Sequence, residues 1–282
     1  MAVITMTQEM ATLGKDVALG VSEALGLQQV RHEVGDMVAG RMHVKKSLIR
    51  RIREGKASRL EKWASDEKTI SIFTAQEIFD LAVKGNVLIR GWGATLFLRE
   101  VSHIASIRVC APMELRVQRL MERLETDDEA LARHEIEVDD AAHATRMGEH
   151  FNVHWGDPTL YDLTLNTGRI AAATCVDQVV ALVKSAPFKE TPESRRHLED
   201  LALEARARAA LRADERTETI DVAIEAKAGR IKLAGIVVDE REKALCREVV
   251  EKVEGVVGVD DELRTMSGKL GLFPQVTRRK DM

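Results

Sequence analysis

The sequence predicts an α/β fold in which a parallel sheet is flanked by helices, followed by a small α+β domain of αββαβ order. Through the first two thirds of the chain, short apolar runs bounded by Gly or Pro alternate with helical patterns, an order typical of parallel sheets covered by helices. After residue 220 the pattern changes to strand-like alternation. With 282 residues and 45% hydrophobic content, the chain can supply each of two domains with a core.

The chain opens with a strand, a loop and a helix. Ala2–Thr5 is a short apolar run typical of a buried strand, and Lys15–Leu25 places apolar residues at helical spacing. Gly14 and Lys15 therefore stand where a loop enters a helix. Free backbone N–H groups and the helix dipole point at an anion in such a position.

Further strands and helices follow the same alternation. Each predicted strand is bounded by Gly or Pro or lies between helical patterns. The predicted strands are Asn86–Ile89, Ile104–Ala111 and Tyr161–Leu165, and the predicted helices are Pro112–Leu124, a helix that begins at Thr126, and Cys175–Val183.

The second domain is predicted from a break in both periodicities around Pro187. Thr191, Pro192 and Glu193 then form a typical helix start, and this helix ends near Arg212. Alternation on both sides of Gly229 predicts a hairpin, which is followed by a helix and a last strand. The predicted divisions are residues 1–186, a linker and helix start at 187–197, a small domain at 198–266 and a flexible tail at 267–282.

Composition restricts the partners of the protein. The net charge of -4 and pI near 6.1 argue against a nucleic-acid binder, which needs clustered Lys and Arg. Cys110, Cys175 and Cys246 fit neither a disulfide framework nor a zinc site, and are interpreted as buried, reduced thiols. The first residues lack a signal-peptide pattern and no run is apolar enough to cross a bilayer, so we expect a cytoplasmic protein that is not transmembrane.

The first loop only partly meets the phosphate-binding pattern GxxxxGK[ST]. Glu9 stands at the first glycine position, and Asp16 stands where Ser or Thr would bind magnesium. Taken alone, Gly14 could equally relieve crowding at a helix start while Lys15 is solvated. The loop by itself therefore leaves both interpretations open.

Four ordered segments resemble the cytidylate kinase-like family, and together they span most of residues 1–185. They are Ile4–Ala18 (ITMTQEMATLGKDVA), Gly85–Arg99 (GNVLIRGWGATLFLR), Ala111–Arg119 (APMELRVQR) and Phe151–Thr167 (FNVHWGDPTLYDLTLNT). The resemblance implies a P-loop kinase fold that binds ATP on the first loop and holds a pyrimidine nucleoside monophosphate opposite it with arginines. It also implies Mg²⁺, with Asp16 as its protein ligand.

The same resemblance implies roles for individual residues. Charge stabilisation during phosphoryl transfer is assigned to Lys15, Arg90, Arg116 and Arg119, ATP binding to Thr12, Leu13, Gly14, Lys15 and Asp16, and acceptor binding to Arg90, Trp92 and Asp140. Arg116 and Arg119 lie one turn apart, so they could equally form a solvated basic face of their helix.

The sequence also departs from the family pattern at positions that carry charge in many relatives. Trp92 stands between two glycines where an arginine is common, and Ala141 and His143 replace arginines of the lid-like helix. Loss of one such cation lowers the rate of phosphoryl transfer by several powers of ten. Nucleotide binding is therefore better supported than catalysis. Three hypotheses remain open: a kinase that acts on a pyrimidine nucleoside monophosphate, a kinase that acts on another phosphoryl acceptor, and a non-catalytic sensor or scaffold.

Two histidines and two tryptophans have alternative roles. His150 and His154 are four residues apart, but the WGDP segment that follows ends the helix, so we do not expect them to share a metal. Trp92 and Trp155 could stack on a nucleobase. Core packing is the favoured role of Trp155.

Residues 198–266 resemble a BON domain. The resemblance is carried by Gly229 and Gly235 around the second strand and by the run Val253–Val259 before Leu263. It implies a regulatory or ligand-binding module that contacts a protein partner or phospholipid. Acids and bases are mixed along the module, which favours a protein contact over adhesion to anionic lipid.

Overall fold

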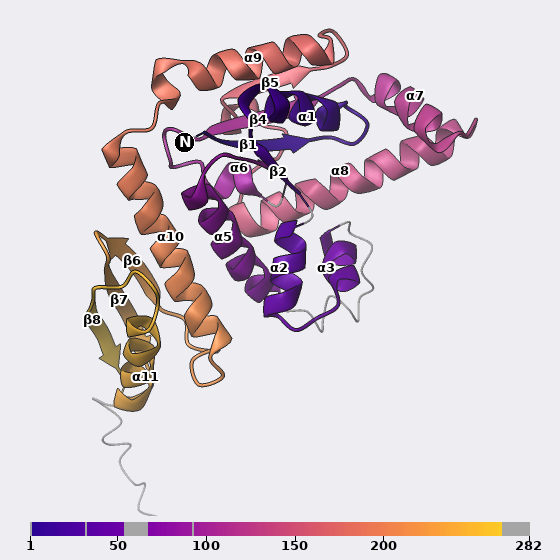
Figure 1. Ribbon diagram of the computed structural model, residues 1–282. Helices are drawn as coiled ribbons and strands as arrows, with labels where there is room; N and C mark the ends of the chain where they lie inside the picture. Colours follow the sequence, from indigo (N-terminus) through magenta and orange to yellow (C-terminus); the bar gives the residue numbers. More distant parts are fainter. Residues whose placement is uncertain (1, 32, 54–66, 92, 267–282) are drawn as a thin grey trace, which may run out of the picture. The chain divides into compact units, whose positions relative to one another are not determined.

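The computed structural model describes residues 2–31, 33–53, 67–91 and 93–266 (Figure 1). Within it the chain divides into two compact units, Met1–Ala205 and Arg206–Met282. Trp92 and the tail 267–282, both subjects of predictions above, lie outside the described residues. Among the described residues, every helix is too short or too polar to span a lipid bilayer.

The first unit is built on a parallel sheet of five strands in the order β2-β3-β1-β4-β5. The strands are β1 (Val3–Gln8), β2 (Gln28–Val30), β3 (Val87–Arg90), β4 (Ala105–Cys110) and β5 (Leu163–Asn166). Residues 3–7 of β1 are all buried, as expected for a central strand covered on both faces. The predicted parallel sheet is thus confirmed.

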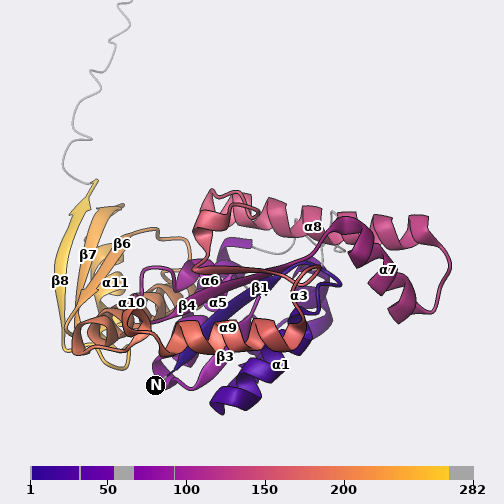
Figure 2. The ribbon, with the colours of Figure 1, turned by 90° about the horizontal axis from the view of Figure 1, so that it is seen from above.

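Helices cover both faces of the sheet (Figure 2). Helix α1 (Gly14–Leu25) packs beside α9 (Ala172–Lys184) on one face, where Val17, Val21 and Val179 enter the core. The opposite face carries α5 (Glu67–Lys84), α6 (Ala94–Phe97) and α8 (Glu129–Phe151). Further described helices of this unit are α2 (Glu33–Arg41), α3 (Lys46–Arg53) and α7 (Met113–Leu124), and short 3-10 turns occur at Pro158–Leu160 and Ala186–Phe188.

Helix α8 begins later than the sequence suggested. The predicted start was Thr126, whereas the helix begins at Glu129. Asp128 is the N-cap, and its side chain accepts a hydrogen bond of 2.9 Å from the amide of Leu131. An aspartate oxygen satisfies an N–H group that has no partner inside the helix, so Asp128 fixes the helix start.

The second unit contains a sheet of three strands and one helix packed on it. A hairpin joins β6 (Ala223–Lys227) to β7 (Arg230–Val237), and β8 (Gly258–Thr265) pairs parallel with β7. Ala228 and Gly229 both have positive φ, the conformation of a tight hairpin turn. With α11 (Glu240–Glu251) between β7 and β8, and α10 (Pro192–Ala213) before β6, the predicted αββαβ order is confirmed.

The fold determines where a site can form. Strands β1, β3 and β4 are parallel, so their carboxyl ends meet at one edge of the sheet. The residues that follow them there are Glu9, Gly91 and Ala111. Ligands in open α/β sheets bind at this edge.

Candidate functional site

The loop from β1 to α1 is held in a defined conformation. The hydroxyl of Thr12 donates to the carbonyl of Glu9 at 2.8 Å, and the carbonyl of Thr12 accepts from the hydroxyl of Thr167 at 2.7 Å. Ala11 and Leu13 both have φ near 59°, in the left-handed region. Leu13 is the N-cap of α1, so the amides of Gly14 and Lys15 stand in the first turn of the helix, where N–H groups have no acceptor inside the helix.

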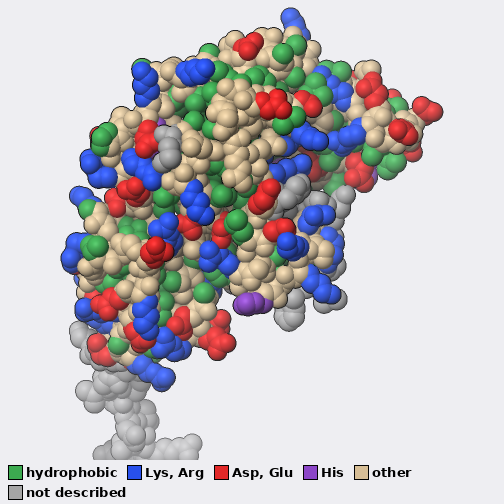
Figure 3. All heavy atoms as spheres, in the orientation of Figure 1, with side chains coloured by type: hydrophobic (Ala, Val, Ile, Leu, Met, Phe, Trp, Pro, Cys, Tyr) green, Lys and Arg blue, Asp and Glu red, His purple; other side chains and the backbone are tan. Residues whose placement is uncertain are grey.

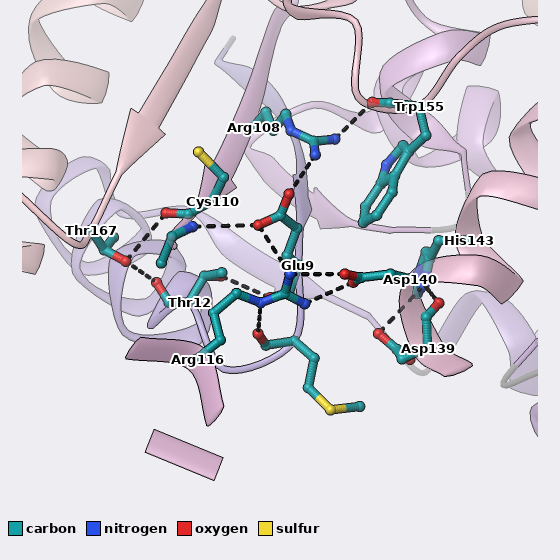
Figure 4. A network of polar contacts seen from close by, with 12 residues as sticks. Glu9, Thr12, Arg108, Cys110, Arg116, Asp139, Asp140, His143, Trp155 and Thr167 are labelled. Atoms are coloured by element: carbon teal, nitrogen blue, oxygen red, sulfur yellow. Dashed lines mark hydrogen bonds and ion pairs between the residues drawn. The ribbon is translucent and has the colours of Figure 1, made fainter. Parts of the chain in front are cut away.

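Glu9 stands at the first glycine position of the phosphate-binding pattern, and its side chain lies inside this loop (Figure 4). Its carboxylate is 2.6 Å from a guanidinium nitrogen of Arg108 and 3.5 Å from one of Arg116, and it accepts a bond of 3.3 Å from the amide of Ala111. Both arginine side chains are less than one tenth exposed. Glu9 is therefore the internal counter-ion of two buried cations.

Arg116 is fully occupied by protein groups. Two of its guanidinium nitrogens donate to the carboxylate of Asp140 at 2.8 and 2.7 Å, and its Nε donates to the carbonyl of Met10 at 2.8 Å. The structure thus brings together two predicted site residues, Arg116 and Asp140, as partners of each other (Figure 4). This ion pair attaches α8 to α7 and the loop.

Arg119 also binds protein groups. It donates to the hydroxyl of Thr167 at 3.1 Å and to the carbonyl of Thr167 at 2.9 Å. Thr167 in turn bonds Thr12 of the first loop. Arg119 therefore holds Thr167, which in turn fixes the backbone of the first loop at Thr12.

Next to the loop lies a cleft of about 230 Å³, here called the basic cleft. Four cationic side chains line it, and Asp139 is its one carboxylate among the described residues. The cations are Lys15, Arg31, Arg90 and Arg123. They come from the start of α1, the end of β2, the end of β3 and the last turn of α7, and Lys and Arg side chains are visible beside the α7–α8 pair (Figure 3).

Arg90 is the most buried cation of the basic cleft. It is 4% exposed, and one guanidinium nitrogen donates to Oε1 of Gln8 at 2.7 Å. Its Nε is buried and has no hydrogen-bond partner among the described groups. Burial, and next the charge of Arg31, lower the pKa of Arg90 to about 10, so the guanidinium remains protonated at neutral pH. A buried, charged donor without an acceptor is what an anionic ligand would satisfy.

Gly14 is required by the packing around Arg90. A Cβ atom at Gly14 would lie 2.6 Å from Oε1 of Gln8 and 2.8 Å from its Cβ. Because the same Oε1 accepts from Arg90, a side chain at position 14 would displace the group that orients the guanidinium. The glycine thus allows the loop, Gln8 and Arg90 to pack together.

Asp16 fits a single-carboxylate magnesium ligand. It lies in the first turn of α1 beside Lys15, and its side chain is exposed. Among the described residues there is no group of three His, Cys, Asp or Glu side chains that could hold a metal by itself. Magnesium bound with a phosphate needs only one or two carboxylates, because phosphate oxygens and waters complete its shell.

Sequence reasoning did not find Arg31, Arg123, Asp139 or His143 as cleft residues. Arg123 follows Arg119 by one turn on α7, so the run of arginines on that helix was the available signal. His143, noted only as an arginine replacement, stacks on Trp155 with ring centroids 5.0 Å apart. Arg31 follows β2 and Asp139 lies in α8, so these two residues are brought together by tertiary packing and not by a local pattern.

Trp155 is a core residue, as predicted. It is 6% exposed, and its Nε1 donates to the hydroxyl of Thr7 at 3.2 Å. The guanidinium of Arg108 lies 4.5 Å from its ring centre. The indole thus contacts buried protein groups through its ring and through its N–H.

Comparison with known proteins agrees with this architecture. Residues 3–169 match the model of the cytidylate kinase-like family, and residues 199–266 match that of the BON domain, as the two resemblances predicted. No curated protein matches the chain at a significant level.

The comparison with solved structures found similar chains at low sequence identity. An uncharacterized protein from Eubacterium ventriosum is 19% identical with a TM-score of 0.52, covering 66% of this chain and 100% of its own. A shikimate kinase from Acinetobacter baumannii in complex with shikimate is 15% identical with a TM-score of 0.40, covering 67% of this chain and 96% of its own.

Proposed function

Because this chain belongs to the cytidylate kinase-like family, we propose that its basic cleft binds the phosphates of ATP and that the first unit transfers the terminal phosphoryl group. One observation carries the proposal: Lys15, at the start of α1, shares the cleft with three arginines, one of which has an unsatisfied buried donor. Phosphoryl transfer depends mainly on positioning and on positive charge around the transferring group.

In this proposal each cleft residue has a distinct task. The amides of Gly14 and Lys15 and the ammonium of Lys15 hold the phosphates, while Arg90, oriented by Gln8, stabilises charge in the same cleft. Asp16 would hold Mg²⁺, an ion that supplies neutralising charge beside phosphate oxygens. Arg116 and Arg119 act as positioning residues, because they hold Asp140 and Thr167.

A pyrimidine nucleoside monophosphate is the acceptor to test first, because the family description names cytidylate. The BON unit would add a regulatory contact, with a protein partner favoured over phospholipid. In that unit the cations on the outer face of β7 are paired with acids of β8, Arg230 with Asp260 and Lys232 with Glu262. A requirement for ATP is also consistent with the cytoplasmic location expected from the sequence.

The second candidate is a nucleotide sensor or scaffold without turnover. It is favoured by the occupancy of Arg116, whose guanidinium is already bound by Asp140 and lies near Glu9. A phosphate could recruit this cation only by displacing two carboxylates. In this case the basic cleft binds ATP, and the BON unit reports the bound state to a partner.

Calorimetric titration with ATP and magnesium, followed by an assay of ADP release with CMP present, tests both candidates. We expect Lys15→Met to weaken ATP binding by at least about tenfold, because a charge-assisted contact to phosphate is lost. Lys189→Met removes an exposed lysine outside the basic cleft and should leave binding unchanged.

Three outcomes separate the candidates. ADP release that depends on CMP supports the kinase, and tight ATP binding without ADP release supports the sensor. Equal ATP affinity of the native protein and Lys15→Met would contradict both, because each requires the basic cleft.

A further inference from the structure

Helix α8 places a histidine in the basic cleft. His143 and Asp139 are four residues apart on this helix, so they lie on one face of it, and both line the cleft. The other charged residues of the described lining are Lys15, Arg31, Arg90 and Arg123. An imidazole changes its charge between about pH 5 and pH 8, whereas lysine, arginine and carboxylate groups ordinarily do not. His143 is therefore the group of the described lining whose charge responds to pH near neutrality.

The imidazole of His143 is held by two contacts (Figure 4). Its ring stacks on the indole of Trp155, with centroids 5.0 Å apart and planes inclined by 20°. Its Nδ1 lies 3.0 Å from the backbone carbonyl oxygen of Asp139, and because a carbonyl oxygen only accepts, Nδ1 carries the hydrogen of this bond. Nε2 is therefore the nitrogen that takes up a proton when the ring becomes charged. Contact with an aromatic face stabilises the charged ring.

The charge of His143 determines how the carboxylate of Asp139 acts on an anion in the cleft. Nδ1 of His143 lies 3.6 Å from Oδ2 of Asp139, and both side chains are 22% exposed, so their charges interact more strongly than they would in bulk water. When the ring is neutral, the carboxylate repels a phosphate. When the ring is protonated, its positive charge offsets that of the carboxylate.

The other charged neighbours of His143 keep their charge across this pH range. Arg146 lies one turn further along α8, and its charge interacts with that of Asp139. Arg108 of β4 lies with its guanidinium 4.5 Å from the centre of the Trp155 ring. Arginine remains protonated at neutral pH, so neither residue adds a pH-dependent charge.

We propose that His143 is a phosphate-binding residue of the basic cleft that acts in its protonated form, so that the affinity for ATP falls as the pH rises through neutrality. The inference rests on the proposed function of the cleft as the ATP site. Protonation adds one positive charge beside the phosphates and offsets Asp139. Since coupling between two ligands is reciprocal, a phosphate that binds the protonated form more tightly also draws a proton onto His143.

Calorimetric titration of the full chain with ATP at pH 6 and pH 8 tests this role, with magnesium in excess so that ATP stays ionised. The native protein should bind ATP about fivefold more tightly at pH 6 than at pH 8. It should also take up protons on binding, which is measured as a binding enthalpy that varies with the ionisation enthalpy of the buffer. His143→Gln should lose both effects, and His143→Arg, whose charge is permanent, should bind tightly at both pH values.

His134→Gln is the matched control, because it removes an exposed histidine of α8 that does not line the cleft, and it should behave as the native protein does. If the native protein bound ATP equally at both pH values without proton uptake, the role of His143 would be overturned without any variant, while the ATP site would stand. A shared pH profile of the native protein and His143→Gln would overturn it as well. Absence of ATP binding at either pH would contradict the proposed function and this role together.

Discussion

At the scale of single residues, Glu9 shows how a departure from a motif is built into the structure. It stands where the phosphate-loop pattern has glycine, and its carboxylate is 14% exposed between the guanidinium groups of Arg108 and Arg116. Removing one partner of a buried ion pair leaves a buried charge uncompensated, which costs far more than loss of a surface pair. Glu9 is therefore a structural residue of the first loop.

We predict that Glu9→Gln lowers the free energy of unfolding of the first unit by about 3 kcal/mol, because Arg108 loses its carboxylate while buried. Urea denaturation followed by tryptophan fluorescence measures this change, since all tryptophans precede residue 206. Glu23→Gln, an exposed site on α1, should change stability by less than about 0.5 kcal/mol. Equal stability of the two variants would show that Glu9 is dispensable to the loop.

The sequence pattern indicated Lys15, at the start of the helix after the first strand and loop, and Arg90, at the end of a strand; both line the basic cleft, and their roles there stay a prediction. It could not predict the pairing of Glu9 with Arg108, since the two are 99 residues apart. Nor could it show that Arg116 and Asp140 bind each other, because two helices must first meet. Long-range pairing of charges is set by tertiary packing, on which local patterns carry no information.

At the scale of elements, the strands that the sequence predicted are those with strong patterns. Strands β3 and β4 were expected within one residue of their observed bounds, whereas β1 was expected to end at Thr5 and extends to Gln8. The hairpin β6–β7 was expected around Gly229, where it is observed. Strand β2 has only three residues, too few to show a periodicity. Helix α5 buries residues around much of its circumference, including Thr74 and Glu77, so it lacks the one-sided apolar stripe of a surface helix.

The junction of the first loop and α1 carries a further prediction, which concerns Leu13. This residue is the N-cap of α1 with φ of 59°, and a side chain in that region costs about 1–2 kcal/mol. Leu13→Gly should therefore leave the free energy of unfolding unchanged or raise it by up to about 1 kcal/mol. Leu19→Gly, an exposed leucine within α1, should lower it by about 1 kcal/mol.

Thermal and urea unfolding of the two glycine variants measure the difference directly. The comparison is matched, because both leucines are partly exposed, at 37% and 48%, and both become glycine. If Leu13→Gly destabilised the protein as much as Leu19→Gly, the left-handed conformation at position 13 would be contradicted.

At the scale of the whole molecule, the chain carries two units, each with its own hydrophobic core. In the first unit Val179 of α9 is fully buried beneath the sheet, and in the second Val250 of α11 is fully buried against β7 and β8. Separate cores allow each unit to be destabilised on its own, since substitutions at sites that share no partners act independently. ATP bound in the basic cleft would stabilise the first unit by mass action alone.

We therefore predict that Val250→Ala accelerates hydrogen exchange in α11 and β7 but not in α1, and that Val179→Ala does the reverse. Each change removes two buried methyl groups from a helix and should cost about 2 kcal/mol in its own unit.

Saturating ATP, at about 100 times its Kd, should slow exchange in α1 by an amount that corresponds to about 2.7 kcal/mol. Protection of α11 by ATP as well would show that the two units are energetically coupled, which the regulatory role of the BON unit requires. If ATP slowed exchange in the first unit alone, the two units would not be energetically coupled, and regulation of the BON unit through nucleotide binding would be contradicted.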